Sequence, residues 1–194
     1  IYSDDGGKTW KIGGAIPWVP EFRHGECTIV ERSDGSLLMN MRTSAPGVYS
    51  FGYRLTSVSK DHGLTWSNPV VDKNLPCPAC QASMISFNEK EVLFLNPAVN
   101  HHGGFSIWSR KNMTLRLSSD DGRSWAASRV LNKGLSGYSD MAINGKGQIL
   151  CVLKSPCCTP APPHPAPPRS APRRARARSS PPASGAPRAD ASNP

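Results

Sequence analysis

The sequence predicts an all-β fold of the propeller type, with one blade for each copy of a repeated motif. The motif is Ser-x-Asp-x-Gly-x-x-Trp, and it occupies residues 3–10, 59–66 and 118–125. Four short strand-like segments fall within each period of roughly 58 residues, and no segment has a convincing helical period. A β-sandwich of similar strands is the alternative. It does not account for the even recurrence of one motif.

The motif predicts a tight turn at the tip of a β-hairpin. An Asp side chain can accept hydrogen bonds from the backbone N–H groups just after it, and Gly supplies the positive φ of a tight reversal. The Trp then buries a large ring where the return strand begins. Three unrelated polar turns are the alternative, because turn residues cluster in loops. Four fixed positions at near-even spacing favour a repeat.

The elements follow in order along the chain. Residues 1–10 are expected to be the end of a strand and its turn, and residues 11–24, with two Gly and two Pro, a connecting loop. Short β-rich runs then alternate with turn signals such as Ser33-Asp34-Gly35. The strands predicted in this way are 27–31, 37–41, 53–59, 70–71, 82–87, 92–95, 113–118, 126–131, 138–143 and 148–153.

The basic charge is concentrated towards the C-terminal end. The chain has 194 residues and a net charge of +9, and residues 156–194 contain six arginines but only one aspartate. The remainder is therefore only mildly basic, and we expect no nucleic-acid partner. No apolar run reaches the roughly 20 residues needed to span a bilayer, so no membrane span is expected in this segment.

The two ends of the chain differ from the rest. Residues 156–194 hold twelve of the 19 prolines and no large apolar residue, so we expect a disordered Pro/Ala/Arg-rich tail after a propeller part at 1–155. The tail interrupts a blade after two strands, which indicates either an unspliced or frame-shifted reading or a genuine basic linker. The chain starts at Ile1 without an initiator Met or a signal peptide, so we expect an internal piece of a longer protein.

The cysteines give little support for a metal site. Cys77 and Cys80 have a metal-like C-x-x-C spacing, but no second such pair occurs, and the nearest His pair is His101-His102. A structural zinc site needs four ligands. Buried or loop thiols are the favoured interpretation, and no metal or cofactor is expected.

The repeated motif resembles the Asp-box of sialidases (neuraminidases), whose catalytic domain is a six-bladed β-propeller. The resemblance covers residues 1 to about 155, which would contain about three of the blades. It implies that the boxes lie on the face away from the active site and serve a structural role. Asp-boxes also occur in other glycosidases, sorting receptors and non-enzymatic propellers, so the functional inference depends on other residues.

Four positions resemble the sialidase active site. Glu26 stands in His-Gly-Glu-Cys, and Arg42 follows it by sixteen residues. Arg110 precedes the strand into the third box, and Tyr138 follows it by 28 residues in Gly-Leu-Ser-Gly-Tyr-Ser-Asp. The resemblance implies that Tyr138 is the nucleophile, Glu26 its base, and Arg42 with Arg110 the clamp for the substrate carboxylate.

The chemistry of sialic acid explains why these residue types belong together. The sugar carries a carboxylate on the carbon that undergoes substitution, and arginines bind it through paired, charge-assisted hydrogen bonds. A carboxylate nucleophile would be repelled by that anion, so sialidases use a Tyr. A phenol with a pKa of about 10 is a poor nucleophile at neutral pH, and a neighbouring Glu can take its proton.

The resemblance implies an exo-α-sialidase that removes terminal sialic acid from glycoproteins, glycolipids or oligosaccharides with retention of configuration. The alternative is a non-catalytic Asp-box propeller that binds glycans or proteins. Each of the four residues alone is more often an ordinary strand-end or loop residue. Their joint occurrence in phase with the boxes favours the enzyme. The family's first arginine and its Asp acid/base are expected upstream, so this piece alone is expected to be inactive or poorly folded.

The remaining candidates have weaker support. Arg54 and Arg116 lie within strands that lead to boxes and are expected to be structural. Neither Asp61 nor Asp140 matches the family's acid, and His24 and Cys27 flank Glu26, where they are expected to shape the pocket. Asn112-Met113-Thr114 is a glycosylation sequon. Together with the resemblance, it favours a secretory, lysosomal or extracellular location.

Overall fold

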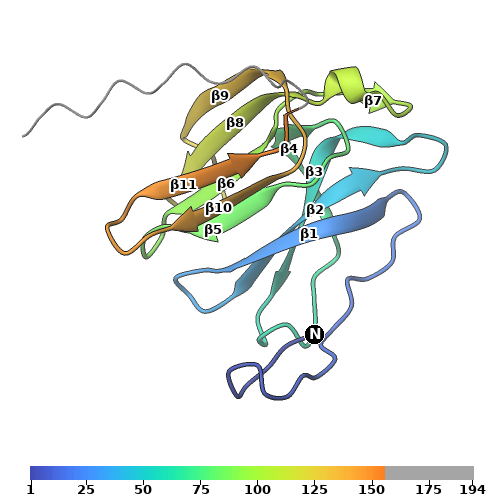
Figure 1. Cartoon of the computed structure of the whole chain (residues 1–194). Helices are drawn as coiled ribbons and strands as arrows, with labels where there is room; N and C mark the ends of the chain where they lie inside the picture. The colour runs from blue at the N-terminus through green and yellow to red at the C-terminus, as the bar shows by residue number, and fades with distance from the viewer. Residues whose placement is uncertain (156–194) are drawn as a thin grey trace, which may run out of the picture. The chain divides into compact units, whose positions relative to one another are not determined.

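The computed structural model describes residues 1–155, and the predicted Pro/Ala/Arg-rich tail at 156–194 lies outside the described residues. The described part is all-β, with antiparallel sheets and one short 3-10 helix (Figure 1). The first sheet has the order β1 (Arg23–Glu31), β2 (Leu37–Ser44), β3 (Ser50–Ser59), β4 (Val70–Cys77). The second has the order β5 (Ser83–Ser86), β6 (Val92–Pro97), β8 (Lys111–Ser118), β9 (Ala127–Leu135). The third pairs β10 (Ser139–Ile143) with β11 (Ile149–Leu153).

The first two sheets thus each contain four strands that pair in chain order, as expected for propeller blades. The first strands of the three sheets lie next to one another, with β5 between β1 and β10 (Figure 1). A two-residue strand, β7 (His102–Gly103), also pairs with the start of β3, and the 3-10 helix η1 (Ile107–Ser109) precedes β8.

Strand β6 lies between two hydrophobic clusters and contributes side chains to both. All six of its residues are buried. Side chains of a strand alternate between faces, so Val92 and Phe94 enter one cluster while Leu93 and Leu95 enter the other. The first cluster joins the first two sheets through residues such as Leu38 and Leu75, and the second reaches Met141 on β10. The three sheets are therefore held together by apolar packing on both faces of β6.

The hydrogen bonds of the Asp-box turns form as the sequence predicts, but the predicted burial of the Trp ring is wrong for the first box, where Trp10 is 62% exposed. In the second box, Ser59 Oγ donates to Asp61 Oδ1 at 2.8 Å and accepts from Gly63 N–H at 2.8 Å. The Asp61 carboxylate also accepts from the backbone and hydroxyl of Thr65, and Gly63 has φ +86°. The other two boxes repeat this pattern of side-chain hydrogen bonds.

Several element boundaries differ from the predictions. Residues 1–10 were expected to include the end of a strand, but they form only an isolated bridge between Tyr2 and Lys11. Strand β1 begins at Arg23 rather than at residue 27, so Glu26 lies inside a strand. The polar run at residues 23–26 is extended because β2 supplies its backbone partners, with Arg23 opposite Ser44.

Arg54 and Arg116 are buried within the sheets, in agreement with a structural role. Arg54 is 0% exposed, and it donates to Asn40 Oδ1 at 2.6 Å and to the Cys80 carbonyl at 2.6 Å. Arg116 donates to Asn96 Oδ1 at 2.8 Å. Each guanidinium therefore bonds to an Asn on a neighbouring strand.

In residues 1–155 no helix combines the length and apolar character required to cross a bilayer.

Candidate active site

The structure brings the four predicted site residues together. Glu26 Oε2 accepts a hydrogen bond from Arg42 Nη1 at 2.7 Å, and Glu26 Oε1 accepts one from the Tyr138 hydroxyl. The guanidinium carbon of Arg110 lies 5.9 Å from the centroid of the Tyr138 ring. A phenol and a carboxylate are thus directly bonded and flanked by two guanidinium groups.

These residues lie at the end of the sheets opposite the boxes. The register pairs Leu37 with Ser59 at the box end of the first sheet, whereas Arg42 pairs with Gly25 near the other end of the β1–β2 ladder. The register of β1 shifts between Gly25 and Cys27, so Glu26 occupies a β-bulge. Bulges re-aim side chains, and here the bulge places the Glu26 carboxylate within reach of both Arg42 and Tyr138.

Arg110 is fixed by the segment before β8. Its backbone N–H donates to the Ile107 carbonyl at 3.1 Å, and its carbonyl accepts from Ser136 N–H at 2.8 Å. Arg110 Nη2 donates to the Ala79 carbonyl at 2.9 Å. Ala79 has φ +49°, a conformation uncommon for a residue with a Cβ. Arg110 Nε is buried and has no hydrogen-bond partner within residues 1–155.

Tyr49 belongs to the site, although the sequence analysis missed it. Its hydroxyl accepts hydrogen bonds from Arg42 Nη2 and, at 3.4 Å, from Arg110 Nη2. The Arg42 guanidinium also lies 4.9 Å from the Tyr49 ring centroid, and Phe105 contacts that ring edge-on at 5.1 Å. Pro46-Gly47 indicates a turn in the sequence. That turn signal does not indicate that Tyr49, two residues after Gly47, contacts two arginines.

The electrostatics define the resting protonation states of the Tyr138–Glu26 pair. Burial acts to raise the pKa of Glu26, but hydrogen bonds from Arg42 and Tyr138 outweigh it and hold this pKa below its ordinary value. The hydrogen bond to Glu26, together with burial, raises the pKa of Tyr138. Glu26 is therefore the ionised acceptor and Tyr138 the protonated donor of the pair.

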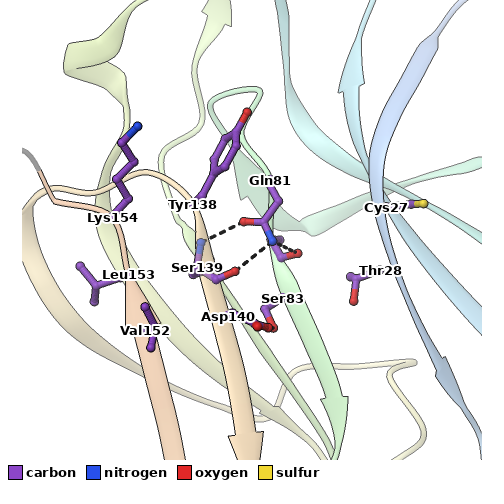
Figure 2. A pocket seen from close by; sticks show the side chains of 11 residues that line it. Cys27, Thr28, Gln81, Ser83, Tyr138, Ser139, Asp140, Val152, Leu153 and Lys154 are labelled. Atoms are coloured by element: carbon purple, nitrogen blue, oxygen red, sulfur yellow. Dashed lines mark hydrogen bonds between the residues drawn. The ribbon is translucent and has the colours of Figure 1, made fainter.

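Two cavities flank Tyr138, whose side chain is 44% exposed. The larger, of about 670 Å³, is lined by residues of β1, β5, β10 and β11 and includes Cys27, Gln81 and Asp140 (Figure 2). The smaller, of about 240 Å³, lies against Arg110 and Ile107. His24 lines a separate hollow with Glu26 and Arg42.

The other predicted candidates lie elsewhere or have other partners. Asp61 is part of the second box, and Asp140 accepts from Ser83 Oγ at 3.3 Å and from Met141 N–H at 2.8 Å. Cys77 and Cys80 are buried thiols, and burial raises the pKa of Cys80 to about 11. In the described range, no group of three or more His, Cys, Asp or Glu side chains is placed to hold a metal ion.

The sequon Asn112-Met113-Thr114 lies in β8. Asn112 has φ +56° at a register shift and is partly buried, while Met113 and Thr114 are buried. Its use stays a prediction.

The comparisons with known proteins identify the family of the chain. The family model described as a BNR repeat-like domain matches residues 1–151. The chain is 37% identical over 150 residues to a sialidase of Micromonospora viridifaciens, covering 73% of this chain and 21% of that protein. It is 32% identical over 162 residues to a sialidase of Vibrio cholerae, covering 73% and 20%. The chain thus spans about a fifth of the length of these relatives.

Solved structures of similar proteins share the fold of this chain. The Hadza microbial sialidase Hz136 superposes with a TM-score of 0.56 at 32% identity, covering 72% of this chain and 26% of that one. A leech intramolecular trans-sialidase superposes with a TM-score of 0.60 at 24% identity, covering 78% and 23%, which supports the fold alone. These neighbours confirm the prediction of a β-propeller, of which this chain contributes sheets that do not close into a ring. The chain therefore belongs to the BNR repeat-like family, and its homologues are sialidases.

Proposed function

We propose that the protein containing this chain is an exo-α-sialidase, which hydrolyses terminal sialic acid from glycoproteins, glycolipids or oligosaccharides. The observation that carries the proposal is the hydrogen-bonded series Tyr138–Glu26–Arg42, with Arg110 beside the Tyr138 ring. A structural scaffold has no need for a phenol bonded to an ionised carboxylate between two arginines. Such a set suits a substrate with a carboxylate at its reacting carbon.

In the first step, the phenolic oxygen of Tyr138 forms a bond to the anomeric carbon while the bond from that carbon to the aglycone oxygen breaks. The phenolic proton passes to Glu26, with which it already shares a hydrogen bond. The departing aglycone oxygen takes a proton from an acid that the family resemblance assigns to an Asp outside this sequence. Arg42 and Arg110 bind the substrate carboxylate throughout.

In the second step, water attacks the same carbon and the bond to Tyr138 breaks. Glu26 returns its proton to the phenolate, and the acid recovers its proton from the attacking water. Two displacements at one carbon give net retention of configuration. Arg42 orients Glu26 through its hydrogen bond and keeps the carboxylate ionised in the resting site, although the lowered pKa makes Glu26 a weaker base for the phenolic proton.

The test uses the complete gene product that contains this sequence. We expect it to release the fluorophore from a fluorogenic α-sialoside, with the α-anomer of sialic acid seen first by NMR. Tyr138→Phe should lower kcat/KM by about 1,000-fold or more, since the nucleophile is lost. Tyr53→Phe is the matched control, because Tyr53 lies on β3 and its ring meets that of Phe51 edge-on.

Equal activity in Tyr138→Phe and the wild type would contradict the nucleophile assignment. Binding of the sialoside without any turnover by the complete protein would instead support a non-catalytic glycan-binding propeller.

A further inference from the structure

Gln81, which lies between β4 and β5, bonds to the backbone of a residue 58 positions later. Its Oε1 accepts from Ser139 N–H at 2.9 Å, and its Nε2 donates to the Ser139 carbonyl at 2.9 Å (Figure 2). Nε2 also donates to the Ala82 carbonyl at 3.0 Å. The side-chain amide thus gives Ser139 the pair of hydrogen bonds that a residue on a neighbouring antiparallel strand would give.

These bonds fix the peptide group that joins Tyr138 to Ser139. Its N–H is the Ser139 N–H, bonded to Gln81, and its carbonyl accepts from Lys154 N–H at 2.7 Å. Gly137 N–H in turn donates to the Lys154 carbonyl at 2.7 Å. On the β11 side the partners are backbone groups, which almost any sequence supplies. On the β5 side the partner is one particular side chain.

Tyr138 needs such support because little else holds its ring. The residue is 44% exposed, and cavities lie on both sides of it. Its hydroxyl bonds to Glu26, but that bond must be given up when the phenolic oxygen attacks. A nucleophile displaced by about 1 Å from its reactive position can lose about 100-fold in rate. The direction of the ring therefore depends on how firmly the backbone at 138–139 is held.

We propose that Gln81 is a positioning residue for the Tyr138 nucleophile: its side-chain amide holds the Tyr138–Ser139 peptide so that the phenol points at the reacting carbon. This inference rests on the proposed function. Gln81 acts through the backbone and needs no contact with the substrate. It also links the nucleophile to the second sheet, since Gln81 leads directly into β5.

The variant Gln81→Met tests this role in the complete gene product, because Met has a similar length but no hydrogen-bonding amide. Gln148→Met is the matched control: Gln148 lies in the turn at the far end of the same hairpin and is exposed, and its side chain bonds to Asn144. We expect Gln81→Met to lower kcat about 10- to 100-fold with KM changed less than about twofold. Gln148→Met should leave both constants unchanged.

Amide hydrogen exchange gives a readout that does not need turnover. Exchange at the Ser139 N–H should accelerate at least about tenfold in Gln81→Met and remain at the wild-type rate in Gln148→Met. Gln81→Glu keeps the acceptor but removes the donors, so it should slow turnover while protecting the Ser139 N–H better than Gln81→Met does. Both results would support the positioning role.

Other outcomes would overturn it. A Gln81→Met enzyme with raised KM and normal kcat would mean that Gln81 binds substrate directly. If Gln81→Met changed neither the exchange rate of the Ser139 N–H nor kcat, the hydrogen bonds of Gln81 would not position Tyr138. If the wild type itself gave no turnover, the proposed function would fail together with the positioning role, whereas an active wild type beside an unaffected variant would remove only the latter.

Discussion

The two ends of the sheets are built from different kinds of contact. At the box end, the bonds of the motif Ser and Asp side chains join residues two to four positions apart, as between Ser59 and Asp61 or Asp61 and Thr65, and the pattern occurs three times. At the active-site end, Glu26 bonds to residues 16 and 112 positions away, and this arrangement occurs once within residues 1–155. The box end is a local, repeated structure, whereas the active-site end depends on the packing of all three sheets.

This difference predicts that stability and turnover depend on opposite ends of the sheets. The core of a box can form wherever its eight residues occur, because the partners of its Ser and Asp side chains are within the turn. Within residues 1–155, only the third box adds distant side-chain bonds, such as those from Ser33 to Asp121. The active site assembles only where β1, β2, the segment before β8 and the segment before β10 meet. We therefore expect substitutions at the active-site end to affect turnover with little effect on unfolding, and substitutions at the box end to do the reverse.

Among the substitutions that test this comparison, Arg42→Lys should have the largest effect. Lys keeps the charge but cannot reproduce the two-pronged geometry that reaches Glu26 and Tyr49 at once. We expect kcat/KM for a fluorogenic sialoside to fall about 100- to 1,000-fold in the complete gene product, with a melting temperature within about 2 °C of the wild type. Arg129→Lys, on an exposed position of β9, is the control. A parallel loss of melting temperature would show that Arg42 holds the fold rather than the substrate.

The same contrast explains what the sequence could predict. The bonds of the motif Ser and Asp side chains were predictable because each lies within eight residues. Glu26 and Arg42 were found by family spacing, and their sixteen-residue interval corresponds to neighbouring strands joined by the turn at Ser33-Asp34-Gly35. The start of β1 was placed four residues too late because its first residues are polar and are extended only through their pairing with β2.

Tyr49 and Gln81 could not be predicted in this way. Tyr49 meets Arg110 across 61 residues, and Gln81 meets Ser139 across 58, in each case from a loop between strands. Neither contact follows from a local period or a motif, because it arises only when separately formed sheets pack. The catalytic roles of the four predicted residues stay predictions until turnover is measured.

At the box end, Ser118→Ala should have the largest effect on stability. Ser118 is 0% exposed, and its Oγ donates to Asp120 at 2.7 Å and accepts from the buried Gly122 N–H at 2.8 Å. The Ala variant leaves a buried donor without its partner, so we expect the free energy of unfolding to fall by about 1–3 kcal/mol. Urea unfolding followed by tryptophan fluorescence measures it. The equivalent Ser3→Ala change, in the exposed first box, should cost less than about 0.5 kcal/mol.

If Ser118→Ala and Ser3→Ala destabilised the protein equally, the burial of Ser118 would not increase the contribution of its box to stability. If Ser118→Ala reduced turnover in the fully folded protein, the separation between the two ends would be wrong.

The boxes should also determine part of the response to acid. The hydroxyl of Thr65, followed by its backbone N–H, lowers the pKa of Asp61 to about 2, and Asp5 and Asp120 have pKa values lowered to about 2 by equivalent bonds. A lowered pKa in the folded state stabilises the fold at pH values above the unfolded pKa of about 4, and this stabilisation is lost as the pH falls towards 2. The urea midpoint should therefore decline over that interval.

Thr65→Val sharpens this expectation, because it removes the largest cause of the shift. The pKa of Asp61, read from the NMR titration of its carboxyl carbon, should rise towards its ordinary value, and the decline in the urea midpoint should become shallower. Thr56→Val is the control, since that hydroxyl bonds to a carbonyl at 3.5 Å. An Asp61 titration unaffected by Thr65→Val would contradict the assignment of the shift to this hydroxyl.

The smallest expected effect is that of Tyr49→Phe, and it tests how the active-site end is organised. The Tyr49 hydroxyl accepts from both Arg42 and Arg110, so it can hold the two guanidinium groups at a fixed separation before substrate arrives. The Phe ring keeps the edge-on contact with Phe105 and loses only that bridge. We expect KM to rise about two- to fivefold with kcat nearly unchanged, because pre-organisation of a binding site contributes to affinity. A fall in KM would mean instead that the hydroxyl competes with the substrate carboxylate for the same donors, and that the arginines are held in position by Glu26 and the Ala79 carbonyl alone.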